Sequence, residues 1–231
     1  MFINGFDILW DEIDDYVADI QSIRSIDQLA FTKPVTFFCG ENGSGKSTLL
    51  EALAIKNGLN PEGGTRNYNF STYDSYSDLY NHMRLWRSRK PDWMYFLRAE
   101  SFYNVATKEM EYSGVFSERY HDQSHGQSFF SVLMKQTNKN GLYLLDEPEA
   151  ALSCQNQLAL LYLIQSCVKQ NCQFIIATHS PILLGFPGAQ ILSFDEDKVE
   201  EVDYKSTSSY QTMKLFLDRY DYFVEDLKTM L

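Results

Sequence analysis

Three short apolar runs stand out along the chain, and each is followed by residues that can carry chemistry. They are Val35–Cys39, residues 142–145 and residues 174–177. Runs of four or five apolar residues with polar neighbours are typical of strands buried on both faces of a parallel sheet. Because the carboxyl ends of parallel strands share one edge of the sheet, the residues that follow the three runs are expected to meet there.

Helical spacing predicts the elements that cover this sheet. Residues 48–54 predict a helix after the first run, and residues 208–231 predict a terminal helix. Residues 155–169 predict a third helix, with these apolar residues on one face: Leu158, Leu161, Tyr162 and Val168. Two short runs on either side of residues 195–197 predict a hairpin.

The middle of the chain has a different composition. Residues 59–139 are polar and rich in Tyr and Ser, so we expect a helical or loop-like lobe there, with the strands in residues 1–58 and 140–205. Four cations of this segment surround Trp86: Arg84, Arg87, Arg89 and Lys90. They suit the solvated face and end of a helix better than a basic contact patch.

Composition narrows the class of protein. With 231 residues and a hydrophobic fraction of 44%, the chain is expected to be one domain with two lobes and a real core. There is no long apolar run for a membrane span and no signal-peptide pattern, so we expect a cytosolic protein without membrane insertion. The net charge of −11 argues against nonspecific nucleic-acid binding, leaving contact through a partner or a local patch. The cysteines lack metal-like spacing and are expected to be reduced: Cys39, Cys154, Cys167 and Cys172.

The residues after the first apolar run carry the most informative pattern. Residues 40–47 read GENGSGKS, which fits the phosphate-binding P-loop G-x-x-x-x-G-K-[ST] between a strand and a helix. Its glycines allow successive backbone N–H groups to point at one anion. Lys46 is expected to reach the β- and γ-phosphates, and the Ser47 hydroxyl to bind Mg²⁺.

The other two runs end in acidic and imidazole side chains. Asp146 and Glu147 follow the second run, where buried carboxylates are costly unless they have a role. Asp146 suits Mg²⁺ binding, and Glu147 suits activation of the attacking water. His179 follows the third run and is expected to contact the γ-phosphate. Residues 124–127 read SHGQ, which is either an ordinary capping box or a second phosphate-binding helix start.

As a set, these elements resemble the ABC-type ATPases. Residues 40–48 resemble the first nucleotide-binding motif, and the resemblance assigns ATP contacts to these residues: Gly40, Glu41, Asn42, Gly43, Ser44, Gly45, Lys46, Ser47 and Thr48. The family signature is similar to residues 123–127, which assigns a phosphate contact in a partner subunit to Ser124, His125, Gly126 and Gln127. Residues 143–147 resemble the acidic strand with its catalytic glutamate, and His179 the switch histidine.

Some positions depart from the family pattern. Gln123 and His125 replace the leading Leu and first Gly of the signature, and Ser153 replaces an Asp in the loop after the catalytic glutamate. Glu100 takes the place of a metal-associated Gln. Arg24 and Tyr16 are two candidates for adenine contact, between which the sequence does not choose.

The resemblance implies an α/β fold of the P-loop type, with a mixed central sheet, a short helical lobe and no coiled coil. It lies nearest to the soluble branch that includes SMC, RecF, RecN and small stand-alone bacterial ATPases. It implies ATP and Mg²⁺ as ligands and a homodimer that closes head to tail on ATP. A regulatory or effector ATPase in DNA maintenance or phage defence, with a separately encoded partner, is the favoured interpretation. The alternatives are a transporter's ATP-binding subunit, an ATP-binding module with little turnover and, more distantly, a P-loop kinase.

Overall fold

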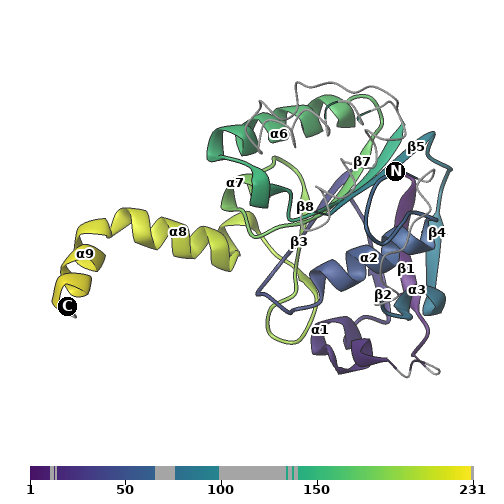
Figure 1. Cartoon of the computed structure of the whole chain (residues 1–231), viewed down its shortest axis with the longest axis horizontal. Coiled ribbons are helices and arrows are strands. Elements are labelled where there is room, and N and C mark those ends of the chain that lie inside the picture. Colours follow the sequence, from purple (N-terminus) through teal and green to yellow (C-terminus); the bar gives the residue numbers. More distant parts are fainter. Residues whose placement is uncertain are drawn as a thin grey trace.

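Two β-sheets form the body of the protein. A computed structural model describes residues 1–10, 13, 15–65, 76–98, 134, 137 and 140–229. The six-stranded sheet has the order β5-β6-β7-β3-β8-β9, and it is parallel except for β9, which pairs antiparallel with β8 (Figure 1). Its strands are these: β3 Val35–Cys39, β5 Trp93–Arg98, β6 Gly141–Asp146, β7 Gln173–Ala177, β8 Gln190–Ser193 and β9 Glu200–Glu201.

A smaller antiparallel sheet lies against the first, with the order β2-β1-β4. Its strands are β1 Ile3–Ile8, β2 Gln28–Ala30 and β4 Met83–Arg87. The side chain of Gln173 on β7 joins the two sheets, because its amide oxygen accepts from the N–H groups of Phe2 (2.6 Å) and Ile3 (3.0 Å). The start of the chain is therefore fixed to the middle of the central sheet.

Helices cover both faces of the central sheet. The longer elements are α2 Lys46–Lys56, α6 Cys154–Val168, α8 Ser208–Asp218 and α9 Tyr220–Thr229. The short ones are η2 Tyr16–Asp19, α1 Gln21–Arg24, α3 Leu79–His82, η4 Pro148–Ala151, α7 Pro181–Leu184 and η5 Tyr204–Ser206. None of the helices in the described ranges is long and apolar enough to cross a membrane.

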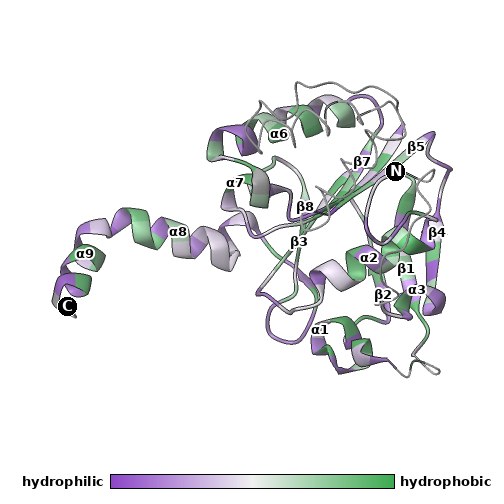
Figure 2. Cartoon of the chain, in the orientation of Figure 1, coloured by the Kyte–Doolittle hydropathy of each residue, from purple (hydrophilic) through white to green (hydrophobic). Residues whose placement is uncertain are grey.

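Alternation along each strand divides the core into two clusters. Leu144 of β6 packs in the cluster with α2 and the small sheet, whereas its neighbour Leu145 packs with α6 and α7. Both leucines are fully buried, because side chains of a strand point to opposite faces. Green stretches run along strands of the central sheet in Figure 2, as expected for strands covered on both sides.

The strand, helix and hairpin predictions around the three apolar runs are confirmed by β3, β6, β7, α2, β8 and β9. Residues 59–139 were expected to be mostly helical or loop-like, with the strands elsewhere, but this segment carries two strands. β5 lies at the edge of the central sheet, paired in parallel with β6, and β4 extends the small sheet. Arg84 and Arg87 therefore lie on a strand and not on a helix. The period-2 alternation of buried Met83 and exposed Arg84 is short, and the clustered cations obscured it.

The apolar face predicted for α6 packs only in part. Leu161 and Val168 lie against the core, whereas Leu158 and Tyr162 are exposed, with Tyr162 at 79%. The fully buried side chains of the helix form a neighbouring stripe: Leu160, Ile164 and Cys167. Both stripes have helical spacing, because α6 contains apolar residues around most of its circumference. The periodicity could identify the helix but could not choose which side packs on the sheet.

Candidate active site

Glycines shape the loop between β3 and α2. Gly40, Gly43 and Gly45 have φ values of 139°, 78° and 90°, in the left-handed region that disfavours other residues. A Cβ on Gly45 would lie 2.7 Å from Ile23 Cδ1, so this position excludes a side chain sterically as well. The loop consequently curls tightly and ends at the start of α2, where the positive end of the helix dipole favours an anion.

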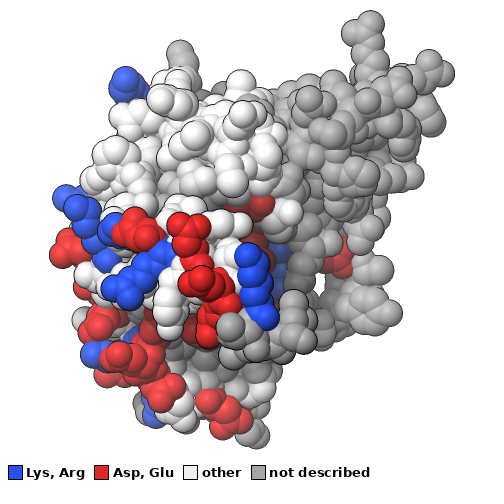
Figure 3. Space-filling view, turned by 90° about the vertical axis from the view of Figure 1, so that its left-hand side faces the viewer, with Lys and Arg blue, Asp and Glu red and all other residues white. Residues whose placement is uncertain are grey.

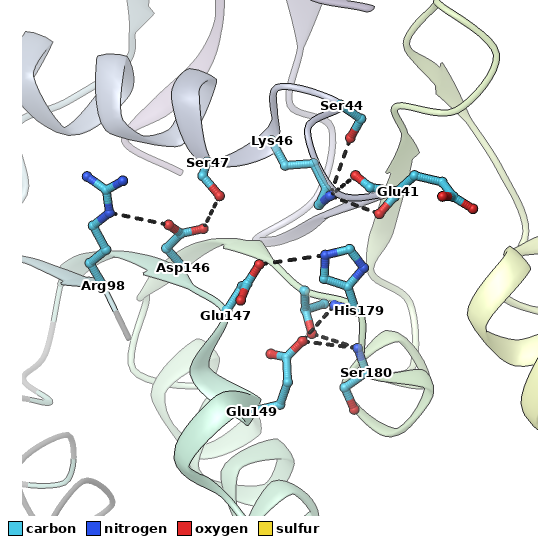
Figure 4. Close-up of polar contacts among 12 residues, drawn as sticks. Glu41, Ser44, Lys46, Ser47, Arg98, Asp146, Glu147, Glu149, His179 and Ser180 are labelled. Carbon is cyan, nitrogen blue, oxygen red and sulfur yellow. Dashed lines mark hydrogen bonds and ion pairs between the residues drawn. The ribbon is translucent and has the colours of Figure 1, made fainter. Parts of the chain in front are cut away.

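Lys46 extends its side chain along the inside of this loop. Its ammonium donates to the carbonyl oxygens of Gly40 (2.8 Å) and Glu41 (2.6 Å) and to Ser44 Oγ (3.3 Å), as Figure 4 shows. Burial lowers the pKa of Lys46 below its ordinary value, although the nearby carboxylates of Glu147, Asp195 and Asp146 oppose the shift. The loop thus holds a desolvated cation whose present partners are neutral, an arrangement suited to binding a phosphate.

Ser47 and Asp146 meet across the edge of the sheet. Ser47 Oγ, at the start of α2, donates to Asp146 Oδ1 over 2.9 Å (Figure 4). Asp146 is buried, and its other oxygen lies 3.8 Å from Nε of Arg98, which also pairs with Glu51 of α2. Arg98 and Glu51 were missed by the sequence analysis. The parallel register that places Arg98 beside Asp146 becomes visible only once β5 is recognised as a strand.

A hydroxyl and a carboxylate oxygen side by side are the donor types that Mg²⁺ prefers. Among the described residues, no group of three or more His, Cys, Asp or Glu side chains is placed to hold a metal. This composition fits Mg²⁺, which usually binds one or two protein oxygens and completes its shell with water and substrate phosphates. Ser47 and Asp146 are therefore suitable protein ligands for that ion.

Glu147 turns away from Asp146 toward the next strand. Its φ of 48° is left-handed, and its N–H donates to the carbonyl oxygen of Ala177 on β7 (2.9 Å). Its Oε1 lies 3.6 Å from His179 Nε2, so the carboxylate and the imidazole face each other beside the loop (Figure 4). Strained backbone of this kind costs about 1–3 kcal/mol and is common at functional sites.

Glu149 holds the strand end that carries His179. Its Oε1 accepts from the backbone N–H of His179 (2.6 Å) and of Ser180 (3.2 Å). Ser180 Oγ in turn caps α7 by accepting from Ile182 N (3.1 Å), and it donates to Gln157 of α6 (2.6 Å). The turn that bears Glu147 is thereby tied to the turn that bears His179. The sequence signal for Glu149 was a third carboxylate two residues after Glu147.

Comparison with known families matches both parts of this site. Residues 18–78 match a family model described as an AAA domain, and residues 125–184 match one described as an AAA ATPase domain. The first segment contains the loop with Lys46, and the second contains Asp146, Glu147 and His179. The structure brings the two segments together at the carboxyl edge of one parallel sheet. Both parts of the site are therefore similar to AAA-type ATPase domains.

The chain is also similar to a curated protein and to several solved structures. An "Uncharacterized ABC transporter ATP-binding protein" of Haemophilus influenzae is 30% identical over 93 residues, which cover 40% of this chain and 35% of that protein. The structure of cbiO1 from Clostridium perfringens is 18% identical, covering 97% of this chain and 100% of that one, with a TM-score of 0.46. The SMC head domain from Thermotoga maritima is 15% identical, covering 87% and 97%, with a TM-score of 0.43.

Two hollows adjoin the loop between β3 and α2. One, of about 690 Å³, lies between Glu41–Ser44 and the hairpin Asp195–Asp197, and the other, of about 570 Å³, lies between Gly40–Asn42, His179 and α8. Asp195 was missed by the sequence analysis; its Oδ1 accepts from Glu41 N–H (3.1 Å) and so holds the loop's first turn. Neither adenine candidate lines these hollows: the guanidinium of Arg24 lies 4.6 Å from the Trp10 ring, and Tyr16 is exposed.

Several predicted site residues lie outside the described part of the chain: Glu100, Ser124, His125, Gly126 and Gln127. Thr48, the last residue of the first motif, lies in the first turn of α2. Ser153 is the N-cap of α6, where its Oγ accepts from Asn156 N (3.3 Å). At this departure from the family pattern, the side chain has a local structural role.

Proposed function

We propose that the chain binds ATP with Mg²⁺ and hydrolyses it. The observation that carries the proposal is the convergence of four groups at one edge of the sheet: Lys46, Asp146, Glu147 and His179. They come from the ends of three adjacent parallel strands, which is where open α/β sheets bind ligands. Lys46 and Asp146 are buried with opposite charge, and Glu147 and His179 lie half-exposed beside them, which is typical of a functional site.

Each group has a distinct role in this proposal. The loop N–H groups and Lys46 bind the phosphates, with Lys46 exchanging its carbonyl partners for phosphate oxygens. Ser47 and Asp146 hold Mg²⁺, which supplies charge neutralisation on the phosphates. Glu147 accepts a proton from the attacking water, and His179 lies close enough to Glu147 to contact the same γ-phosphate.

The dimer is a further part of the proposal. In the head-to-tail arrangement that the family resemblance implies, residues 124–127 of one copy contact the phosphate held by residues 40–47 of the other. Closure would require the nucleotide, and hydrolysis would release it. We propose that the body, residues 1–58 and 140–231, provides the loop and that residues 59–139 provide the signature. The process served would be a cytosolic one, DNA maintenance or defence with a separate partner.

The test uses Glu147→Gln, which keeps the shape of the side chain but removes the base. ATP binding should persist, turnover should fall at least about a hundredfold, and Mg-ATP should convert monomer to dimer in size-exclusion chromatography with light scattering. Glu200→Gln, an exposed carboxylate on β9 paired with Lys198, is the matched control and should behave as the parent. Unchanged turnover in Glu147→Gln would refute its role. Failure of Lys46→Ala to weaken ATP binding would refute the site itself.

A second candidate is the ATP-binding subunit of a transporter. It is favoured by the description of the Haemophilus influenzae protein as an ABC transporter ATP-binding protein, of which the matched part spans 35%. Co-purification of a membrane protein with the chain would support it, and ATPase activity of the isolated chain that does not change on adding membranes would oppose it. ATP binding without measurable turnover in the parent would instead indicate a binding module.

A further inference from the structure

Four side chains form a ring around the carboxylate of Asp146. Ser47 and Glu51 lie four residues apart on α2, so they are one turn apart on the same face of the helix. Arg98 and Asp146 end two neighbouring strands and are direct partners in the parallel register of β5 and β6. Ser47 contacts Asp146, Glu51 contacts Arg98, and Arg98 lies beside Asp146, which closes the ring.

The two oxygens of Asp146 face different groups of this ring. Oδ1 accepts from Ser47 Oγ (2.9 Å), and Oδ2 lies 3.8 Å from Arg98 Nε. Figure 4 shows the hydroxyl and the guanidinium on opposite sides of the carboxylate. A hydroxyl can rotate and the last torsion of an aspartate is broad, so Ser47 alone does not fix the plane of the carboxylate. A cation beside the second oxygen restricts that plane.

Glu51 holds the guanidinium from the other side. Arg98 Nη1 pairs directly with Glu51 Oε2, whereas the 3.8 Å between Arg98 and Asp146 exceeds hydrogen-bond distance. The charge of Arg98 is therefore offset by Glu51 more than by Asp146. In this group of two carboxylates and one guanidinium, the surplus negative charge lies on Asp146, where a metal ion would bind.

Burial distinguishes these charges from the ion pairs of the surface. Figure 3 shows cationic and anionic side chains close together in the lower part of one face, where solvent screening leaves such pairs little effect. The side chains of Glu51 and Asp146 are only 10% and 7% exposed. Buried ion pairs add little stability compared with apolar residues of the same volume, so stability alone does not account for this group.

The orientation of Asp146 matters because of the ion it is suited to bind. Mg²⁺ requires nearly ideal octahedral geometry and takes only one or two carboxylates from the protein. A rotated carboxylate plane would therefore weaken its binding directly. Groups that orient a metal ligand without touching the metal typically change metal affinity by about 10- to 100-fold when they are removed.

We propose that Arg98 is a positioning residue for Asp146 as a magnesium ligand, and that Glu51 holds Arg98 at the distance that leaves Asp146 available to the ion. The inference rests on the proposed function, which assigns Mg²⁺ to Ser47 and Asp146, and it adds two residues that act through Asp146. If Arg98 only competed with Mg²⁺ for Asp146, its removal would strengthen metal binding. The two roles thus predict changes of opposite sign.

The main experiment measures the affinity of the full chain for the β,γ-imido analogue of ATP, which is not hydrolysed, by calorimetry in excess Mg²⁺ and in EDTA. The parent should bind the analogue more tightly in Mg²⁺. Arg98→Ala should weaken binding by about tenfold or more in Mg²⁺ and leave it unchanged in EDTA. Arg98→Lys, which keeps the charge without the fork of the guanidinium, should have an intermediate affinity. Unchanged or tighter binding of Arg98→Ala in Mg²⁺ would overturn the positioning role.

Arg87→Ala is the matched control. Arg87 also ends a strand and contacts α2, but it donates to the carbonyl oxygen of Lys56 (3.0 Å) and to Asn57 Oδ1 (3.2 Å) at the other end of that helix. Its removal should change the effect of Mg²⁺ on affinity by no more than about twofold, as expected for distant sites. A loss as large as that of Arg98→Ala would mean that any loosening of α2 weakens the metal site, which would overturn a specific role for Arg98.

Glu51→Gln tests how Arg98 is held. Without the charge of Glu51, the guanidinium should move toward Asp146 and compete with the ion, so affinity in Mg²⁺ should fall by about tenfold. Combining it with Arg98→Ala should cause no greater loss than Arg98→Ala alone, because Glu51 acts through Arg98. Additive losses would overturn the role of Glu51.

The double variant also guards against loss of folding. Arg98→Ala alone leaves the buried charge of Glu51 without its partner, which is strongly destabilising, whereas the double variant removes both charges. Circular dichroism verifies folding of each variant. If Arg98→Ala does not fold, the double variant decides: the positioning role requires the same loss in Mg²⁺ and none in EDTA.

The two proposals can fail separately. A parent that shows the Mg²⁺ effect but does not hydrolyse ATP would refute the hydrolysis, while the affinities would still decide the role of Arg98. A parent that hydrolyses ATP, with Arg98→Ala binding as tightly as the parent in Mg²⁺, would refute the positioning role alone. Equal affinity of the parent in Mg²⁺ and in EDTA would refute the metal site and, with it, the role of Arg98.

Discussion

Leu144 and Leu217 both belong to regular elements, yet Leu144 of β6 is fully buried while 65% of Leu217 in α8 is exposed. The central sheet receives cover on both faces from α2, α6 and α7 of its own chain. The helices α8 and α9, which form the C-terminal arm, receive almost no cover from the rest of the chain. The comparison shows that apolar spacing specifies which element forms, whereas burial depends on whether the chain supplies a surface to pack against.

The candidate active site and the terminal helices α8 and α9 differ in the same way. Ser47 lies at the start of α2, Asp146 ends β6, and His179 follows β7. The relative positions of these three residues are therefore set within one chain. At the base of α8, Met213 and Phe216 line the hollow beside Gly40–Asn42 and His179, while α9 lies beyond it. A packed site and a largely exposed helical surface are therefore adjacent in this protein.

The largest expected contrast is between the stability losses caused by alanine at a buried and at an exposed leucine. Leu144→Ala should lower the free energy of unfolding by about 2–5 kcal/mol, because it leaves a cavity between β6 and α2. Leu217→Ala should change it by about 0.5 kcal/mol or less, since the side chain contributes little buried area within one chain. Urea unfolding followed by circular dichroism, at a concentration where the chain is monomeric, measures both.

The outcome also tests the exposure of the arm directly. Equal losses for the two alanine variants would show that the arm folds back onto the body in solution. A loss for Leu217→Ala that appears only at high protein concentration would instead support packing between copies. Tyr162→Ala on α6, where the side chain is 79% exposed, is a second surface reference.

A smaller contrast lies within the phosphate loop. Gly45→Ala should cost about 2–4 kcal/mol, because a Cβ there combines left-handed strain with a 2.7 Å contact to Ile23. Gly43→Ala should cost only about 1–2 kcal/mol, since φ is also positive but no atom lies within 4 Å of the added carbon. Unfolding of both variants without nucleotide provides the measurement. A reversed order would mean that the loop is organised differently before it binds phosphate.

Substitution of Glu149 is expected to have the next largest effect on stability. Glu149→Ala leaves the N–H group of His179 without its acceptor, whereas that of Ser180 keeps Thr178 Oγ1 (3.0 Å), and the change should cost about 1–3 kcal/mol of stability. If Glu149 acts by positioning His179, kcat should fall while the affinity for ATP is unchanged. Glu149→Gln keeps one acceptor oxygen and should recover most of both losses. A fall in ATP affinity equal to the fall in kcat would assign Glu149 to nucleotide binding instead.

Much of the fold was predictable because its signals are local. Each of three signals can be recognised from fewer than ten consecutive residues: the run Val35–Cys39, the octet at residues 40–47 and the acidic pair that begins at Asp146. Their meeting at one edge followed from the geometry of parallel sheets, and the hydrogen bond between Ser47 and Asp146 agrees with it. The roles of these residues stay predictions until activity is measured.

The features that could not be predicted depend on contacts between residues that are far apart in the sequence. Arg98 matters through the register of β5 against β6, and Asp195 through a hairpin that returns to the loop. In α6, two apolar stripes compete, and only the position of the helix on the sheet decides between them. The break at Arg219 was likewise missed, because nothing in the apolar spacing of residues 208–231 interrupts there.

The smallest expected effect is a difference in alkylation rate between the exposed and the buried cysteines, with no change in stability. Burial raises the pKa of Cys39 in β3 and of Cys167 in α6 to about 11, and it raises the pKa of Cys172 as well. A raised pKa means less thiolate at neutral pH, so these three should resist iodoacetamide, whereas Cys154, exposed at the start of α6, should react quickly. Mass spectrometry of the folded chain should find one alkylated cysteine, and Cys154→Ser should abolish the fast phase. In urea all four should react, which verifies that burial is the cause. Fast alkylation of Cys39 in the folded protein would mean that β3 opens next to the phosphate loop, and the contrast between a packed sheet and exposed terminal helices would then not hold at the site itself.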